Sequence, residues 1–180
     1  ASTVHNFKSL NSSYYLNHAK ILGGVFTSHL GNRTIIQYCI FMLNSVKLNG
    51  GVLGVVHNSI VSILRCNFSN NSAGNLGGVL HTLNVDEIQL RFLKFANNSA
   101  QITGGGAVSA SGAKFLTSES CKFFNNQVQG SGGTFSMTDT ETLIINASKF
   151  ISNSAAFQGG AIFCENLVNV LVPDCLDYSD

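Results

Sequence analysis

The sequence predicts an all-β protein, a right-handed parallel β-helix with about six coils of 27 or 28 residues. Three observations predict this fold: an internal repeat, short stretches of alternating apolar and polar residues within it, and a composition unsuited to helices. Glycine occurs 18 times and proline once, and charged residues make up only 11%. Glycine, asparagine and serine are frequent and favour turns over helices. Residues 1–180 are expected to form one β-helical domain, a segment or subunit of a larger assembly.

Paired glycines mark the repeat. Successive pairs are 27, 27, 28, 27 and 27 residues apart. Glycine is expected at a corner where the backbone needs a positive φ or packs closely against its neighbour. The pairs are Gly23-Gly24, Gly50-Gly51, Gly77-Gly78, Gly105-Gly106, Gly132-Gly133 and Gly159-Gly160.

Two further columns share this period. An aromatic residue precedes each glycine pair by nine or ten positions and should stack inside the coil. This aromatic column contains Tyr14, Phe41, Phe68, Phe95, Phe123 and Phe150. Three residues later comes an asparagine, which should face inward at a corner and bond to the amides of neighbouring coils. This asparagine ladder contains Asn17, Asn44, Asn71, Asn98, Asn126 and Asn153.

Short strands connect these corners. Mostly apolar positions occur seven and five residues before the aromatic, then two residues before it and at the aromatic itself. This alternation is typical of half-buried strands and predicts about three per repeat. Parallel strands in neighbouring coils lie about 4.8 Å apart, so six coils would give a rod roughly 29 Å long. The right hand is expected from the general preference of parallel crossover connections.

The repeat units resemble those of a known family. Phe68–Leu80, Phe95–Val108 and Phe150–Ile162 resemble the FxxN and GGA[ILV] repeats of chlamydial polymorphic outer membrane proteins, which also occur in surface proteins of algae and other protists. The resemblance covers about residues 7 to 177, although Val or Thr replaces Ala after four of the six glycine pairs. It implies a surface-displayed β-helical passenger, linked to adhesion, with no catalytic residues in the repeat.

Glycosylation sequons, Asn-x-Ser/Thr, occur outside the ladder. No ladder asparagine lies in a sequon, so the sequon asparagines should face outward, as N-glycans require. The alternative is that these sequons only reflect an Asn-rich turn composition. The expected glycosylation sites are Asn11, Asn32, Asn67, Asn70, Asn97 and Asn146.

The five cysteines favour a buried thiol column over disulfides. Cys39 and Cys66 share a column on consecutive coils, about 4.8 Å apart, which lies within disulfide range. Stacked side chains point in parallel, however, and free cysteine is an ordinary core residue. A Cys39–Cys66 or Cys164–Cys175 bridge remains the alternative, while Cys121 lies two coils from either column neighbour.

Charged residues also recur in phase. Lys94, Lys122 and Lys149 should project outward from three consecutive coils. They would either bind acidic glycans or form a solvated edge that discourages strand pairing, and we favour the edge. Asp86, Lys114 and Glu141 share another phase, which predicts a ladder of alternating charge.

The sequence gives little support for catalysis or for a cofactor. The acidic pairs Asp139 with Glu141 and Asp86 with Glu87 are the nearest approach to a glycosidase site, but every coil keeps 27 or 28 residues and no insertion forms a cleft. The histidines are not in phase, so no metal column is expected. They are His5, His18, His29, His57 and His81. A net charge of +1 gives no case for nucleic acid, and no apolar run is long enough for a membrane span.

The function expected from these features is structural and non-enzymatic. No capping helix is evident, and coil residues begin at Phe7, whereas Asp177 falls at the aromatic phase. The open ends should stack head to tail on a second copy, or on flanking repeats of the same chain, to give a filament or coat. We therefore expect a glycosylated extracellular or cell-surface rod, whose partners are itself and its N-linked glycans. An adhesin-like passenger segment is the alternative, and a polysaccharide lyase or hydrolase is less favoured.

Overall fold

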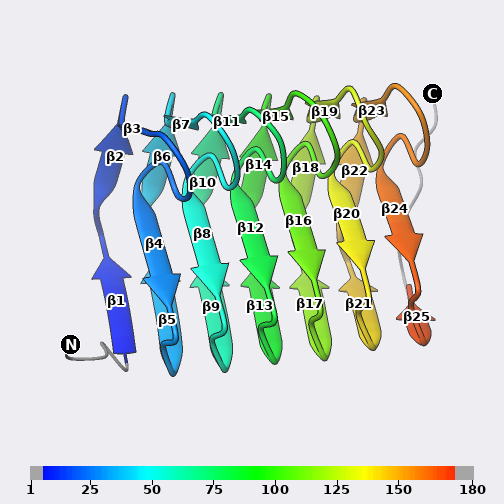
Figure 1. Ribbon diagram of the computed structural model, residues 1–180, viewed down its shortest axis with the longest axis horizontal. Helices are drawn as coiled ribbons and strands as arrows, with labels where there is room; N and C mark the ends of the chain where they lie inside the picture. Colours follow the sequence, from blue (N-terminus) through cyan, green and yellow to red (C-terminus); the bar gives the residue numbers. More distant parts are fainter. Residues whose placement is uncertain (1–5, 173–180) are drawn as a thin grey trace.

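The computed structural model describes residues 6–172, which form an all-β solenoid without a helix in that range (Figure 1). Its 25 strands lie in four parallel sheets that run along the solenoid axis. Each complete coil contributes one strand to every sheet, in the order first, second, third and fourth. The predicted fold class is confirmed.

The strands of each coil differ in length. The first sheet contains β1 (Asn6–Leu10), β5 (Arg33–Gln37), β9 (Ile60–Leu64), β13 (Glu87–Arg91), β17 (Phe115–Glu119), β21 (Thr142–Asn146) and β25 (Asn169–Leu171). The second contains β2 (Ser13–Tyr15), β6 (Ile40–Met42), β10 (Asn67–Ser69), β14 (Lys94–Ala96), β18 (Lys122–Phe124) and β22 (Lys149–Ile151). The third contains β3 (His18–Ala19), β7 (Ser45–Val46), β11 (Ser72–Ala73), β15 (Ser99–Ala100), β19 (Gln127–Val128) and β23 (Ser154–Ala155). The fourth contains β4 (Phe26–His29), β8 (Leu53–Val56), β12 (Leu80–Leu83), β16 (Val108–Ser111), β20 (Phe135–Thr138) and β24 (Ile162–Glu165).

A complete coil therefore has four strands, not the three that the alternation indicates. The additional strand is the third, which follows the ladder asparagine and has only two residues, as in β7. Two residues are too few to show a period of two, so the sequence pattern could not reveal it.

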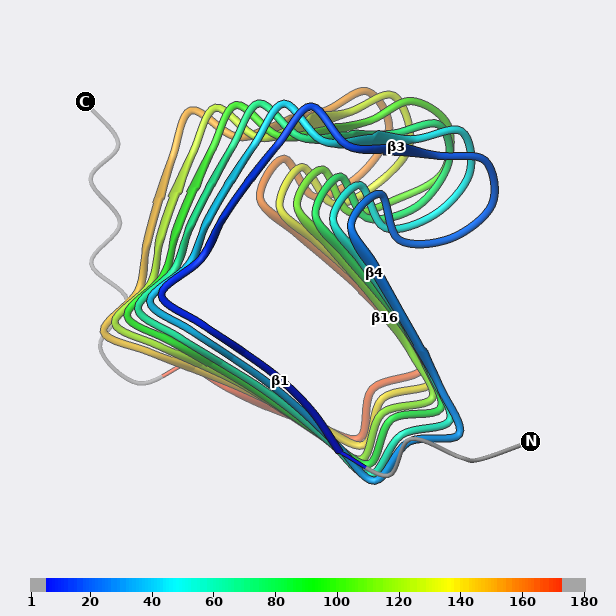
Figure 2. The ribbon, with the colours of Figure 1, turned by 90° about the vertical axis from the view of Figure 1, so that its left-hand side faces the viewer.

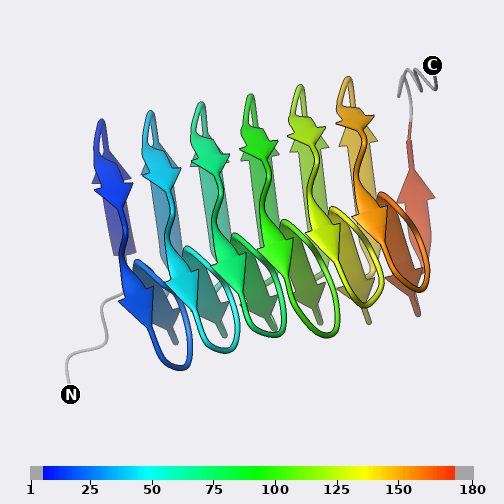
Figure 3. The same ribbon diagram turned by 90° about the horizontal axis from the view of Figure 1, so that it is seen from above.

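The coils wind with a right hand. In Figure 2 the first coil lies nearest the viewer, and the chain runs clockwise from β1 through β3 to β4 as it recedes. Each coil also carries a loop between its third and fourth strands, and these loops form a row along one side (Figure 3). The extra residue of the 28-residue repeat lies in such a loop, because the register step is 27 between β11 and β15 but 28 for the bridge from Leu76 to Gly104.

The core is a stack of aromatic rings surrounded by aliphatic side chains. Phe41, Phe68 and Phe95 are fully buried, and their ring centroids lie 4.9 Å apart with planes nearly parallel. Tyr14 and Phe150 continue the stack at its two ends but are only partly buried. The interior therefore opens toward both ends of the described solenoid.

Candidate functional site

The asparagine ladder runs through the solenoid with a fixed polarity. Asn71 Oδ1 accepts from the backbone N–H and from Nδ2 of Asn44, both at 3.0 Å, and Asn71 makes the same two donations to Asn98. The other Asn71 Nδ2 hydrogen goes to the carbonyl of Phe41 at 3.1 Å. Each ladder residue thus accepts from the preceding coil and donates to the following one, so its buried amide is satisfied only between two coils.

The ladder ends are complementary. At the N-terminal end, Asn17 donates to Asn44, and no described residue donates to its own Oδ1. At the C-terminal end, Asn153 Nδ2 bonds to the carbonyl of Phe123, but residues 6–172 offer its backbone N–H no acceptor. One end therefore presents an acceptor and the other presents donors.

The second glycine of each pair is where neighbouring coils approach most closely. A Cβ atom on Gly78 would lie 2.2 Å from the carbonyl oxygen of Gly106, and one on Gly133 would lie 1.9 Å from that of Gly160. Gly160 differs, because the nearest described atom to its Cβ position is the carbonyl oxygen of Asn153 at 3.5 Å. The last glycine pair thus presents an open site where the next coil would pack.

Apolar side chains are exposed at the C-terminal end. Phe157 is 80% exposed, and all three residues of β25 are exposed. β22, β23 and β24 end their sheets within the described residues, which leaves their outer edges unpaired there. Such edges are templates for further strand pairing.

The structure places the sequon asparagines on the surface and the ladder asparagines inside. Asn44, Asn71, Asn98 and Asn126 are buried, while Asn17 and Asn153 at the ends are half-buried. Five sequon asparagines are exposed, and the sixth, at the end of β21, is half-buried. In order they are Asn11, Asn32, Asn67, Asn70, Asn97 and Asn146.

The cysteines in the described range are free thiols. Cys39, Cys66 and Cys121 are buried, and the backbone N–H of Cys39 donates to Cys66 Sγ at 3.3 Å. Burial raises the pKa of the Cys66 thiol to about 12, which keeps it protonated and unreactive. Cys164 is also free, and its proposed partner, Cys175, lies outside the described residues.

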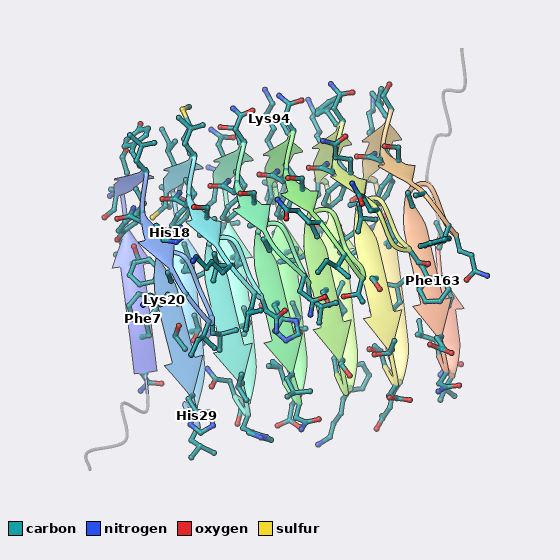
Figure 4. All side chains as sticks on the ribbon, turned by 45° about the horizontal axis from the view of Figure 1, so that its top comes forward. Phe7, His18, Lys20, His29, Lys94 and Phe163 are labelled. Carbon is teal, nitrogen blue, oxygen red and sulfur yellow. The ribbon has the colours of Figure 1, made fainter. Side chains whose placement is uncertain are left out.

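The two columns of charged residues differ, since one consists of lysines in register and the other contains an ion pair. Lys94 and Lys122 are exposed neighbours on the second sheet, with Lys149 next in register, and Lys94 projects from its outer surface (Figure 4). In the other column, Lys114 Nζ lies 2.8 Å from Asp86 Oδ1. That hydrogen bond, and then the charge of Asp86, raise the pKa of Lys114.

The acidic pairs do not converge on a cleft. Asp139 accepts a hydrogen bond from Asn166, and Glu87 accepts one from Gln89. Two open grooves of about 430 and 410 Å³ lie over the third sheet, but their linings are mainly Ser, Ala and Gln and contain no carboxylate.

Two of the histidines lie close together, although they are not in phase. The rings of His29 and His57 lie 5.9 Å apart, although they are 28 rather than 27 residues apart in a 27-residue repeat. Within residues 6–172, no group of three or more His, Cys, Asp or Glu side chains is placed to hold a metal ion. His81 is buried on β12, its Nδ1 has no partner there, and burial lowers its pKa to about 4.

Sequence reasoning missed an exposed ladder at the corner between the first and second sheets. The Arg65 guanidinium lies between the Tyr38 and Phe92 rings, 6.0 and 5.6 Å from their centroids. All three backbones have a positive φ, which is uncommon for side chains of this size. The sequence does contain the pattern that predicts this ladder, because each of the three residues lies three positions before an aromatic of the aromatic column.

Comparison with protein families identifies the repeat. Residues 65–83 and 147–165 match the family model of the Chlamydia polymorphic membrane protein repeat. Both segments are repeats of this type. They occupy the same phase of two different coils and cover the second, third and fourth strands, β10 to β12 and β22 to β24. The resemblance stated from the sequence is therefore confirmed.

The matched repeat is that of a family of surface or outer-membrane proteins that contain a β-helix. No curated protein matches the chain, and no solved structure does. Among the described residues, no helix has the length and apolar character needed to cross a membrane.

Proposed function

We propose that the chain is a non-enzymatic, extracellular structural rod that extends by end-to-end stacking into a glycosylated surface filament or coat. One observation carries the proposal: the two ends of the described solenoid present complementary, unsatisfied groups of the same ladder. Asn153 offers donors and Asn17 offers the acceptor. Because the two ends differ, the contact is heterologous and does not close on itself, which gives a fibre.

The stacked geometry follows from the contacts between coils. An added copy would place its Asn17 Oδ1 near the Asn153 donors and its Gly24 carbonyl over Gly160, as Gly51 lies over Gly24 within the chain. β25 occupies the level that β1 of the added copy would take. Within the described residues it pairs with β21 through three residues, whereas β1 pairs with β5 through five, and stacking would require β25 to give up this place to the incoming strand.

Glycans fit this role because they would cover the sides and leave the ends free. The exposed sequon asparagines lie on strands and corners around the solenoid, for example Asn67 on β10 and Asn97 after β14. Bulky glycans there would oppose sideways association, while the glycine pairs and the ladder stay accessible at the ends.

Stacking is tested by Gly160→Ala, which adds a methyl group that residues 6–172 accommodate but an added coil does not. We expect wild-type protein to form fibres in negative-stain micrographs and the variant to remain as short rods with an unchanged melting temperature. Gln127→Ala, an exposed change on β19, is the matched control and should still form fibres. Fibres of Gly160→Ala with wild-type length would refute the stacking geometry.

Glycosylation has a separate test. Protein secreted from a eukaryotic host should lose mass on treatment with an N-glycosidase, and peptide mapping should place the glycans at exposed sequons such as Asn67 and Asn97. An intact mass equal to that of the bare polypeptide would refute glycosylation.

An adhesin-like passenger is the second candidate, and the Tyr38, Arg65 and Phe92 ladder favours it. Exposed aromatic and arginine side chains are enriched at protein interfaces. Short rods that bind cells, and lose binding on Arg65→Ala, would support adhesion over filament formation.

A further inference from the structure

The small net charge conceals a strong separation of charge along the chain. Residues 1–85 contain five basic residues and no acidic residue, a formal charge of +5. Residues 86–180 contain five basic and nine acidic residues, a formal charge of −4, which leaves the total of +1. A net charge near zero is therefore compatible with two halves of opposite sign.

The solenoid turns this separation in sequence into a separation in space. The coils follow one another along the axis in chain order (Figure 1). Residues 6–85, with five basic and no acidic residues, therefore lie toward the N-terminal end of the described solenoid, and residues 86–172, with five basic and six acidic residues, lie toward its C-terminal end. Opposite charge at the two ends of a rod gives it an electrostatic polarity along its own axis.

The separation is clear at the fourth–first corner, the row of turns that link each fourth-sheet strand to the next first-sheet strand. In the earliest coil this corner carries exposed His29 and Arg33, and Figure 4 shows His29 near the N-terminal end of the row. In the last two complete coils it carries exposed Asp139, Glu141 and Glu165. His29 and Glu165 occupy the same column, at the last positions of β4 and β24.

One internal ion pair lies in the middle of this corner, and among residues 6–172 none lies at its ends. Lys114 pairs with Asp86 at 2.8 Å in the central coils. In the part of the chain that the structure describes, neither Arg33 nor Glu165 has an ion-pair partner. Both end charges therefore remain available to a neighbouring molecule.

We propose that this axial charge separation selects the partner and the orientation of stacking: the acidic C-terminal coil of one copy receives the basic N-terminal coil of a second copy. The inference rests on the proposed function and adds what makes the stacking directional. In a head-to-tail stack, the fourth–first corner continues from one copy to the next, and Glu165 lies one coil from His29 and close to Arg33 of the added copy. Head-to-head contact would place Arg33 against Arg33, and tail-to-tail contact would place Glu165 against Glu165. Both of these arrangements are repulsive.

Salt provides the first test, because charges at an exposed joint are screened. The Debye length falls from about 14 Å at 0.05 M salt to about 4 Å at 0.5 M. We expect the initial rate of fibre growth, followed by light scattering, to fall about tenfold over that range. A rate that is the same at both salt concentrations would overturn the inference.

Charge exchange gives the sharper test. Arg33→Glu places an acidic residue at the N-terminal end of the corner, and Glu165→Lys places a basic residue in its last coil. Each variant alone should assemble about tenfold more slowly than wild type at low salt, and an equimolar mixture should recover the wild-type rate by alternating the two copies. Lys122→Glu, on the exposed face of the second sheet, is the control for an equal change of charge away from the ends and should assemble normally.

The outcomes separate this inference from the stacking proposal. If wild type assembles and Gly160→Ala does not, but the charge variants and salt leave the rate unchanged, stacking stands and charge selection is refuted. If the variants are slow alone but the mixture is not rescued, charge selection is also refuted. If wild type stays monomeric under all conditions, the proposed function fails, and the inference fails with it.

Discussion

Replacing Asn98 with leucine tests the ladder at its best-defined position. Asn98 is fully buried, and its Oδ1 accepts from both the backbone N–H and Nδ2 of Asn71 at 3.0 Å. Its Nδ2 donates to the carbonyl of Phe68 at 3.1 Å and to Asn126 Oδ1 at 3.0 Å. Leucine has a similar volume and none of these groups.

The size of the effect follows from the groups left without partners. The substitution leaves two Asn71 donors without their acceptor and the Phe68 carbonyl without its side-chain donor, while Asn126 Oδ1 still accepts from the backbone N–H of residue 98. Each unsatisfied buried group costs about 1–3 kcal/mol. The two Asn71 donors share one acceptor, so we take the lower part of that range and expect a loss of about 4 kcal/mol in the free energy of unfolding.

Chemical denaturation followed by far-ultraviolet circular dichroism measures this loss. Asn67→Leu is the matched control, since Asn67 is exposed on β10 of the preceding coil. Expressed in a host that does not glycosylate, it should change stability by less than about 0.5 kcal/mol. Equal stability of Asn98→Leu and Asn67→Leu would refute the view that the ladder amides depend on one another.

Three further predictions follow from burial and close packing. Burial lowers the pKa of His81 from 6.5 to about 4, so the free energy of unfolding should be highest above pH 6.5 and should fall by about 3 kcal/mol as the pH drops to 4. His81→Gln should remove this loss, and His57→Gln should not. Gly78→Ala should cost about 3 kcal/mol in thermal or chemical unfolding, since its Cβ would meet a backbone oxygen at 2.2 Å, whereas Gly160→Ala should be nearly neutral in the unstacked chain. The Cys66 thiol, with its pKa raised to about 12, should resist alkylation at pH 8 until denaturant is added, and rapid labelling of the folded protein would contradict its burial.

The fold could be predicted from sequence because the length of the repeat equals the number of residues in one coil of the solenoid. A residue and its equivalent 27 positions later lie side by side on neighbouring strands, as Phe41 and Phe68 do. Each column therefore samples one environment six times, and the aromatic and asparagine columns become visible without any alignment. The same logic indicated the outward position of Asn70 beside the inward Asn71.

Predictions from residues at the same phase of the repeat fail in two cases. One is a contact between residues of different phase, and the other is a strand too short to show an alternation of apolar and polar residues. His29 and His57 meet because long side chains at a corner reach a neighbouring column, which a fixed phase cannot show. The two-residue β7 is defined by its hydrogen bonds to the adjacent coils and not by any alternation of its own. The net charge did not reveal the separation of charge for another reason. It is a sum over all residues and contains no information about which coil each charge lies on.

Gly160 gives the last argument for stacking. In the five earlier pairs the second glycine is needed, because the next coil's carbonyl oxygen lies 1.9–2.2 Å from where a Cβ would be. At Gly160 no described atom imposes this need, and its backbone does not have the positive φ of Gly159. A residue with a side chain would lose less conformational entropy on folding there than glycine does. Glycine at this position is explained if another coil packs against it, and that coil is what the Gly160→Ala experiment removes.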